Sequence, residues 1–325
     1  MSDKKLIEKI NKLSSKYLAT GQDIYSFLDG LLYSDYMGYW DYIHLDTLLS
    51  LQTPKTDFPD EKIFILYHQI TELYFQLCLI ELESINKNGR NVIDTGEDLG
   101  WNKKISAKIF IEKMARVNRY IKHLINSFDI MIDGMDRDQF LKFRMALLPS
   151  SGFQSIQYRM MEIRSTDLKN LTINKQDHVT SIEESFKNIY WKMGAKDLDS
   201  GEKTYTLKQF EKKYEYRLLK LVNKMQKQNV WQKYNTLPQK DQKNKKLISL
   251  LKEYDVNINI NWKLAHYKSA AKYLKNSKKD IDATGGTNWQ EYLPPKFQKI
   301  IFFPNLWSKI EIESWGKSWV ESIVK

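Results

Sequence analysis

Apolar residues along this chain recur mostly every three or four positions, the spacing typical of amphipathic helices. The segment from Asp60 to Ile85 is apolar on nearly every face, which predicts a helix buried in a bundle. Strand-like alternation is scarce, and no strand–helix–strand rhythm is visible. The sequence therefore predicts an all-α fold, a helical bundle. The other helices are predicted over Ser106–Met131, Asp138–Leu147, Leu207–Gln226 and Asn261–Leu274.

Glycine and proline mark the predicted turns between these helices. The stretch Asn235–Lys246 is polar and predicts a loop that joins two helices. Neither an internal repeat nor a clear linker is visible, so we expect one domain over residues 1–325, with a lysine-rich helical excursion at about 184–260. The turn positions are Pro149–Gly152, Ser200–Gly201, Gly285–Gly286 and Pro294–Pro295.

Aromatic residues are the unusual part of the composition. The 325 residues include 9 Trp, 19 Tyr and 14 Phe, and rings of this kind build both ordinary cores and pockets for flat ligands. The net charge of +11 comes mostly from lysines scattered through the helical patterns, without an arginine-rich patch. This pattern favours a solvated surface over a nucleic-acid interface.

The single cysteine, Cys78, excludes an intrachain disulfide and favours a reducing compartment. The first residues alternate charged and apolar side chains and lack the continuous apolar core of a secretory signal. No apolar run approaches the ~20 residues that span a bilayer. We therefore expect a cytoplasmic protein that does not bind a membrane.

Two of the five histidines, His68 and His266, lie in strongly apolar helical surroundings. A buried imidazole must form a hydrogen bond or bind a ligand, and for either residue alone an ordinary core histidine is the simpler interpretation. His68 and Glu72 share a helix face and could meet one metal ion. The paired Glu-x-x-His of di-iron bundles, HExxH, the P-loop and GxGxxG are all absent. A single axial histidine on an apolar helix fits haem better.

Four separated stretches, in this order, resemble motifs of the tryptophan 2,3-dioxygenase family. That family comprises all-helical haem enzymes that open the indole ring of L-tryptophan to N-formylkynurenine, with O2 as co-substrate. No such motif is visible between about 184 and 260. The stretches are YWDYIHLDTLLSLQ (39–52), FILYHQITELYFQ (64–76), FLKFRMALLPSSGFQSIQYR (140–159), and HYKSAAKYL (266–274) followed by ATGGT (283–287).

The resemblance implies a role for His266 as the axial ligand of the iron of haem b. It places Ser151 and Gly152 beside the haem. It also implies that His68 is a catalytic residue on the opposite side, within hydrogen-bonding reach of the indole N–H, and that Phe64 packs on the indole ring.

The resemblance further implies that Arg144 clamps the substrate carboxylate and that Thr284 binds the amino-acid end of the substrate. Tyr39 and Tyr42 match positions that reach into the pocket of a neighbouring subunit, which implies a homo-oligomer, a tetramer or a dimer. The paired glycines Gly285–Gly286 would let the backbone close over bound substrate as a lid.

Departures from the family pattern leave alternatives open. Phe140 stands where the family usually has a tyrosine whose hydroxyl assists in binding the carboxylate. Ala283 and Thr287 replace a glycine and a serine of the loop, and more residues than expected separate His266 from Thr284. One alternative is a related haem-dependent hydroxylase that acts on another aromatic amino acid or an indole derivative. A second is a non-catalytic helical haem-binding protein, which would need no amino-acid clamp.

Overall fold

The all-α prediction is confirmed by the structure, a computed structural model. Among the described residues, backbone pairing of the β type is limited to two isolated bridges, Val92–Asp98 and Thr172–Ile189. The chain divides into two compact units, residues 1–53 and 54–325, which we describe separately. The structure describes residues 3–34, 37–100, 103–147, 150, 152–173, 181–193, 195, 202–275, 295 and 299–317.

The first unit consists of four helices with almost no core of their own. Ile24 is the one buried residue among them within this unit's described helices. Asp23 caps the second helix by accepting hydrogen bonds from the backbone N–H groups of Tyr25 and Ser26. The helices are α1 (Asp3–Ala19), α2 (Ile24–Leu32), α3 (Tyr39–Tyr42) and α4 (Leu45–Ser50).

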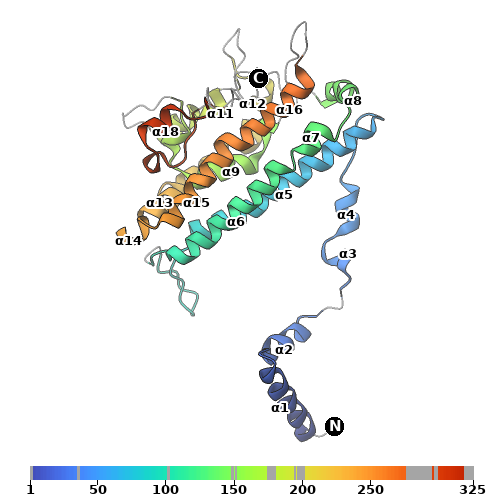
Figure 1. The fold of residues 1–325 in the computed structure, drawn as a ribbon, viewed down its shortest axis with the longest axis vertical. Helices are drawn as coiled ribbons and strands as arrows, with labels where there is room; N and C mark the ends of the chain where they lie inside the picture. The colour runs from blue at the N-terminus through green and yellow to red at the C-terminus, as the bar shows by residue number, and fades with distance from the viewer. Residues whose placement is uncertain are drawn as a thin grey trace. The chain divides into compact units, whose positions relative to one another are not determined.

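The second unit is built on two long helices, α5 (Pro59–Lys87) and α6 (Ala107–Asn126), which lie side by side (Figure 1). The sequence prediction for α5 holds to within two residues at each end. The prediction that the helix starting near Ser106 reaches Met131 is wrong at its C-terminal end. Helix α6 ends at Asn126, and a separate helix α7 (Asp129–Asp133) follows.

By length and composition, α5 is apolar enough to cross a membrane, contrary to the sequence expectation that no segment is. It packs within the bundle, in contact with α6, α9, α8 and α13. Its buried residues include the carboxylate of Glu81, which pairs with Lys113 at 2.9 Å and Arg116 at 3.3 Å, and Asn86, whose amide donates to the Gln228 carbonyl at 2.9 Å. These polar contacts bind α5 to its neighbours within the bundle.

Short helices carry the segment that contains the predicted substrate residues. The prediction over Asp138–Leu147 corresponds to α8 (Arg137–Phe143) followed by a 3-10 turn, η1 (Arg144–Leu147). A second 3-10 turn, η2 (Gly152–Gln154), precedes α9 (Ile156–Ser165), which begins where the Ser155 hydroxyl accepts from the Tyr158 backbone N–H. Helix α9 packs against α5 on one side and α12 on another.

The described part of the lysine-rich region at about 184–260 consists mostly of helices and belongs to the second unit. The polar stretch predicted as a loop between two helices contains a short helix of its own, α14. The remaining elements of this region are η3 (Leu168–Leu171), α10 (Ile182–Lys187), α11 (Tyr190–Met193), α12 (Tyr205–Met225), α13 (Val230–Asn235), α14 (Gln239–Gln242) and α15 (Lys245–Val256).

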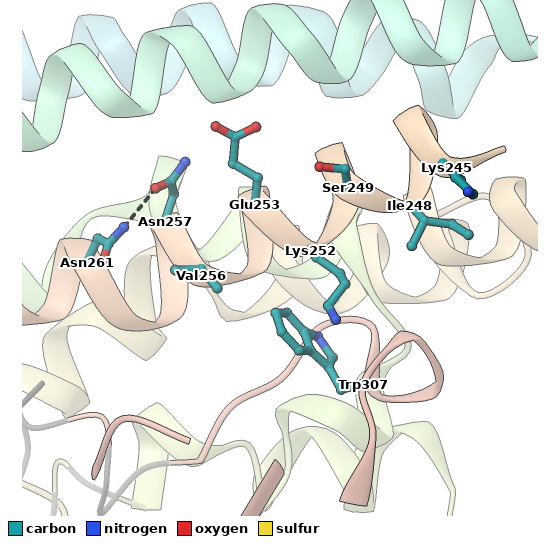
Figure 2. A pocket seen from close by; sticks show the side chains of 9 residues that line it. All are labelled: Lys245, Ile248, Ser249, Lys252, Glu253, Val256, Asn257, Asn261 and Trp307. Atoms are coloured by element: carbon teal, nitrogen blue, oxygen red, sulfur yellow. Dashed lines mark hydrogen bonds between the residues drawn. The ribbon is translucent and has the colours of Figure 1, made fainter. Parts of the chain in front are cut away.

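One continuous helical path joins α15 to α16 (Trp262–Leu274) through a π-helical turn, η4 (Asn257–Asn261). The helix that the sequence predicts to start at Asn261 therefore starts at Lys245. Within the π turn, the Asn261 amide donates to the Asn257 side-chain oxygen at 2.9 Å (Figure 2). A π turn widens the helix and rotates the side chains that follow it, so η4 sets the direction in which the side chains of α16 point.

A cleft of about 610 Å³ lies along the outside of this path (Figure 2). None of the predicted site residues lines it. On one wall, the Lys252 ammonium lies 4.1 Å from the centre of the Trp307 ring and pairs with Glu311 at 2.7 Å. The lining residues are Lys245, Ile248, Ser249, Lys252, Glu253, Val256, Asn257, Asn261 and Trp307.

The last described segment, with η5 (Pro304–Leu306) and α18 (Lys309–Glu313), is held on this path by Asp255. The fully buried carboxylate accepts from the backbone N–H of Phe302 at 2.9 Å, that of Phe303 at 3.1 Å, the Trp307 indole at 3.0 Å and the Asn259 amide at 2.8 Å. Burial nevertheless raises the pKa of Asp255 to about 6.

Candidate functional site

His68 lies in the middle of α5, and its ring is oriented by the backbone one turn before it. The His68 Nδ1 is 2.7 Å from the carbonyl oxygen of Phe64. A carbonyl can only accept, so Nδ1 carries the hydrogen and Nε2 keeps its lone pair. Burial lowers the pKa of His68 and keeps the ring neutral. The residue therefore presents a hydrogen-bond acceptor on the side away from its own helix.

His266 on α16 has the same arrangement. Its Nδ1 is 3.0 Å from the carbonyl oxygen of Trp262, four residues earlier, so Nε2 is again the nitrogen with a free lone pair. Burial, with a smaller contribution from the nearby His68, lowers the pKa of His266 to about 4. A neutral imidazole with an oriented Nε2 is the form that ligates a metal, and the hydrogen bond to the Trp262 carbonyl fixes the orientation of the ring. The donor therefore fits an axial iron ligand.

Aromatic rings connect the two histidines. The Phe128 ring centre lies 4.6 Å from that of His266 and 5.5 Å from that of Tyr67, which in turn contacts His68 at 5.9 Å. On the other side of His68, the Phe64 ring centre is 4.1 Å away. The fold thus brings two histidines 198 positions apart in the sequence into one aromatic environment.

The protonation of His266 gives a test of this environment. Its pKa is about 4 in the folded chain against 6.5 for the free side chain, so the unfolded chain takes up the proton first as the pH falls. The stability contributed by this residue is therefore present above pH 6.5 and is lost as the pH falls toward 4. Between pH 7 and pH 5 we expect the loss to reach up to about 2 kcal/mol.

Asp255 acts in the opposite direction, since its raised pKa stabilises the fold at low pH and this gain is lost as the pH rises through about 6. Because Asp255 changes stability over the same pH range in both chains, its effect cancels when two chains are compared. The measurement is the urea unfolding of the ligand-free wild-type chain and of His266→Leu, each at pH 7 and at pH 5. The difference in unfolding free energy should shrink by that amount from pH 7 to pH 5. An unchanged difference would show that His266 is not desolvated.

The predicted substrate residues on α5 and α8 lie around the same rings. Phe64 contacts Phe143 at 5.7 Å and Phe140 at 6.2 Å between ring centres. Arg144 follows Phe143 directly, at the start of η1, and is 5% exposed. Arg144 is thus a buried arginine that directly follows, along the chain, a ring of the aromatic cluster that contains His68.

Phe140, which stands where the resemblance expects a tyrosine, packs against several aromatic rings. Its centre lies 5.5 Å from that of Phe143 and 4.6 Å from that of Tyr273, on α16. The Tyr273 hydroxyl donates weakly to the carbonyl oxygens of Ile132, at 3.4 Å, and Met135, at 3.3 Å. The position thus contributes apolar contact to the site and no hydroxyl.

Glu72, the possible metal partner of His68, is held by another residue. The Gln157 amide donates to the Glu72 carboxylate at 2.8 Å and to its backbone oxygen at 2.8 Å. Gln157 belongs to the SGFQSIQYR stretch, so this motif ties α9 to α5. The Glu72 carboxylate therefore forms part of the contact between α5 and α9.

The remaining predicted residues divide into three groups. Gly152 begins η2, and a Cβ added to it would meet none of the described residues within 4 Å. Tyr39 and Tyr42 lie in α3 of the first unit, where both are exposed. Ser151, Thr284 and the Gly285–Gly286 pair lie outside the described residues.

Sequence reasoning missed Phe128, Tyr67 and Trp262 as neighbours of the histidines. Trp262 had a usable signal, because a residue four positions before a helical histidine presents its carbonyl to Nδ1. Phe128 had none, since it lies in the break between α6 and α7 that the periodicity did not predict.

Comparison with known proteins identifies the family to which the chain belongs. The profile of the family described as tryptophan 2,3-dioxygenase matches residues 30–284. The chain is 35% identical over 150 residues to a tryptophan 2,3-dioxygenase of Ruegeria sp. (strain TM1040), covering 46% of this chain and 49% of that protein. It is 32% identical over 145 residues to the one of Dictyostelium discoideum, covering 43% and 34%. The chain spans about half or less of the length of these curated relatives. Because the family profile matches more than half of the chain, this protein belongs to the tryptophan 2,3-dioxygenase family.

Proposed function

We propose that this chain is a haem-dependent dioxygenase that opens the indole ring of L-tryptophan to N-formylkynurenine. The observation that carries the proposal is the pair of half-buried histidines, each with Nδ1 bound to a carbonyl and Nε2 left free, within one aromatic cluster. Family membership supports the reaction.

His266 would hold the cofactor. One imidazole supplies one ligand, and haem b supplies the ring nitrogens that complete a stable iron site. When bound, the haem supplies the activation of O2. The low pKa of His266 keeps its Nε2 unprotonated at neutral pH, so protons do not compete with iron. Ser151 and Gly152 would lie along the edge of the haem.

The substrate would be positioned at both of its ends. Arg144 would bind the carboxylate and Thr284 the ammonium end, while Phe64 packs against the indole. The free Nε2 of His68 would accept the indole N–H, a role that requires the neutral tautomer set by the Phe64 carbonyl. Both atoms of O2 enter the product as the C2–C3 bond of the indole breaks. The protein contributes by holding the reacting atoms together and excluding water.

We also propose that the active form is an oligomer, a tetramer or a dimer, in the cytoplasm. Tyr39 and Tyr42 would then contribute to a neighbouring subunit. On α5, apolar side chains spaced three or four residues apart remain exposed, a surface that suits a second copy: Ile70, Leu73, Leu77 and Ile80. Sedimentation of the purified protein as a monomer would contradict the oligomer. The buried free thiol of Cys78 suits a reducing compartment.

The test is a haem titration followed by an activity assay. The wild-type protein should bind haem with a strong Soret band, and the reduced holoprotein under O2 should convert L-tryptophan to N-formylkynurenine, detected by mass. Failure to take up haem would refute the proposal. Haem uptake with oxidation of another aromatic amino acid or indole derivative, but not tryptophan, would instead identify the related oxygenase, which the apolar surroundings of Phe140 would suit.

A further inference from the structure

The helical path that carries His266 changes its hydrogen-bond spacing inside η4. At the end of α15, the Asn257 backbone N–H donates to the Glu253 carbonyl, four residues earlier. At the end of η4, the Trp262 N–H donates to the Asn257 carbonyl, five residues earlier. A turn with this wider spacing holds one residue more than an α-helical turn. Every residue of α16 is therefore displaced by one position from an uninterrupted α-helix.

This displacement decides which side chain of α16 faces the aromatic rings around His266. One residue of an α-helix corresponds to a rotation of about 100°. If the five-residue spacing closed to the four-residue one, Ala265 would take the direction that His266 has. An alanine offers no lone pair to a metal. The extra residue in η4 therefore determines whether α16 presents a ligand.

Side-chain hydrogen bonds span the wider turn. The Asn261 amide donates to the Asn257 side-chain oxygen at 2.9 Å, as Figure 2 shows. The Asn259 amide donates to the Asp255 carboxylate at 2.8 Å. Each bond joins residues four positions apart, where the backbone bond runs over five. Asparagine and β-branched isoleucine, the residue types of η4, are weak helix formers, so the backbone itself has little preference for the α-helical spacing.

A contact from another helix also fits the wider spacing. In an α-helix the Ile258 carbonyl would accept the Trp262 N–H, which here goes to Asn257 instead. The Tyr158 hydroxyl, from α9, donates to the Ile258 carbonyl at 3.4 Å, a long hydrogen bond. Helix α9 thus supplies a donor to the carbonyl that the wider turn deprives of its α-helical partner.

Trp262, the first residue after the turn, transmits this direction to His266. Its ring centre lies 5.6 Å from that of Phe75 and 5.0 Å from that of Phe128. Its carbonyl oxygen lies 3.0 Å from the Nδ1 of His266. A rotation of α16 would therefore take the indole out of its packing and the imidazole out of its position together.

We propose that Asn257 and Asn261 are positioning residues for the proposed iron ligand. Their hydrogen bond keeps the extra residue inside η4, and this turn directs the His266 imidazole toward the aromatic rings that surround it. The inference rests on the proposed function for its consequence, haem binding. Both asparagines act through the direction of α16. Breaking their bond should therefore do more harm than removing the extra residue altogether.

The test compares a substitution with a deletion at position 261. Asn261→Leu keeps the extra residue but breaks the hydrogen bond, so the turn can close and we expect the haem dissociation constant to rise about 3- to 10-fold. Deletion of Asn261 places Trp262 four residues after Asn257, so the same backbone bond becomes α-helical. The deletion variant should bind haem within about 2-fold of the wild type. Asn261→Gln, which keeps an amide donor on a longer side chain, should recover part of the loss.

Asn223→Leu is the matched control. Asn223 is exposed on α12, and its amide donates to the carbonyl four residues earlier, that of Leu219, at 3.0 Å. This variant should bind haem like the wild type. A second measurement is the near-ultraviolet circular dichroism of the haem-free chain, which reports the fixed packing of aromatic rings. The signal should be retained in the deletion variant and reduced in Asn261→Leu.

A deletion that weakens haem binding more than the substitution would overturn the proposal. That is the result for a helix of ordinary spacing, in which a deletion turns every later residue by about 100°. Haem binding and circular dichroism that are both unchanged in Asn261→Leu would overturn it as well. If the wild type takes up no haem, the proposed function fails, and the order of the circular dichroism signals still decides whether η4 directs α16.

Discussion

Replacing His266 with alanine is expected to weaken haem binding by more than about 100-fold. This exceeds the loss of metal affinity that usually follows when a residue hydrogen-bonded to a metal ligand is removed. The Nε2 of His266 is the oriented lone pair that α16 offers to a metal, since Nδ1 is bound to the Trp262 carbonyl. Tryptophan oxidation should disappear with the haem. The measurement is a haem titration followed by the Soret band and by N-formylkynurenine formation.

The control is His123→Ala, because His123 is exposed on α6 and has no predicted role. Added imidazole should enter the space left in His266→Ala and restore part of the Soret absorption. If the variant binds haem as tightly as the wild type and with an unchanged spectrum, His266 is not the axial ligand.

Replacing Arg144 with methionine should lower kcat/KM for L-tryptophan by about 100-fold or more, the range for loss of one partner of a buried charged pair. A guanidinium that is 5% exposed can bind a carboxylate through two parallel hydrogen bonds, which an ammonium cannot reproduce. Arg144→Lys should therefore recover only part of the loss. Because Phe140 supplies no hydroxyl, we expect this chain to depend on Arg144 more than relatives with a tyrosine at that position would.

Tryptamine, which has the indole but no carboxylate, separates binding from folding. Its turnover should be low in the wild type and nearly unchanged in Arg144→Met. Arg119→Met is the matched control, since Arg119 is exposed on α6. A loss of the same size for tryptophan and tryptamine would mean that Arg144 supports the fold and does not recognise the carboxylate.

The sequence predicted the long apolar helices well and their interruptions badly. The two ends of α5 could be predicted because apolar side chains continue through the whole segment and Pro59 marks its start. The path through η4 could not be predicted, because the alternating asparagines at 257, 259 and 261 are typical of loops and helix ends. The Asp255 carboxylate on this path accepts from the N–H groups of Phe302 and Phe303, 47 and 48 residues later, a pairing that no local pattern reveals.

The sequence indicated which histidines are candidates for the site, but not how their rings are oriented. The apolar surroundings of His68 and His266 marked them as candidates, but their roles came from the family resemblance. That Nδ1 is the bound nitrogen in both rings is visible only in three dimensions.

The carboxylate of Asp255 also constrains the order in which the protein can fold during synthesis. Until residues 302–307 have left the ribosome, three of its four hydrogen-bond donors do not exist, so Asp255 stays hydrated. A hydrated charge cannot enter the core, and α15 therefore cannot pack fully against its neighbours. His266 lies eleven residues beyond Asp255 on the same helical path. The nascent chain thus completes the packing of the helix that carries its proposed iron ligand only after residues 302–307 have been synthesised.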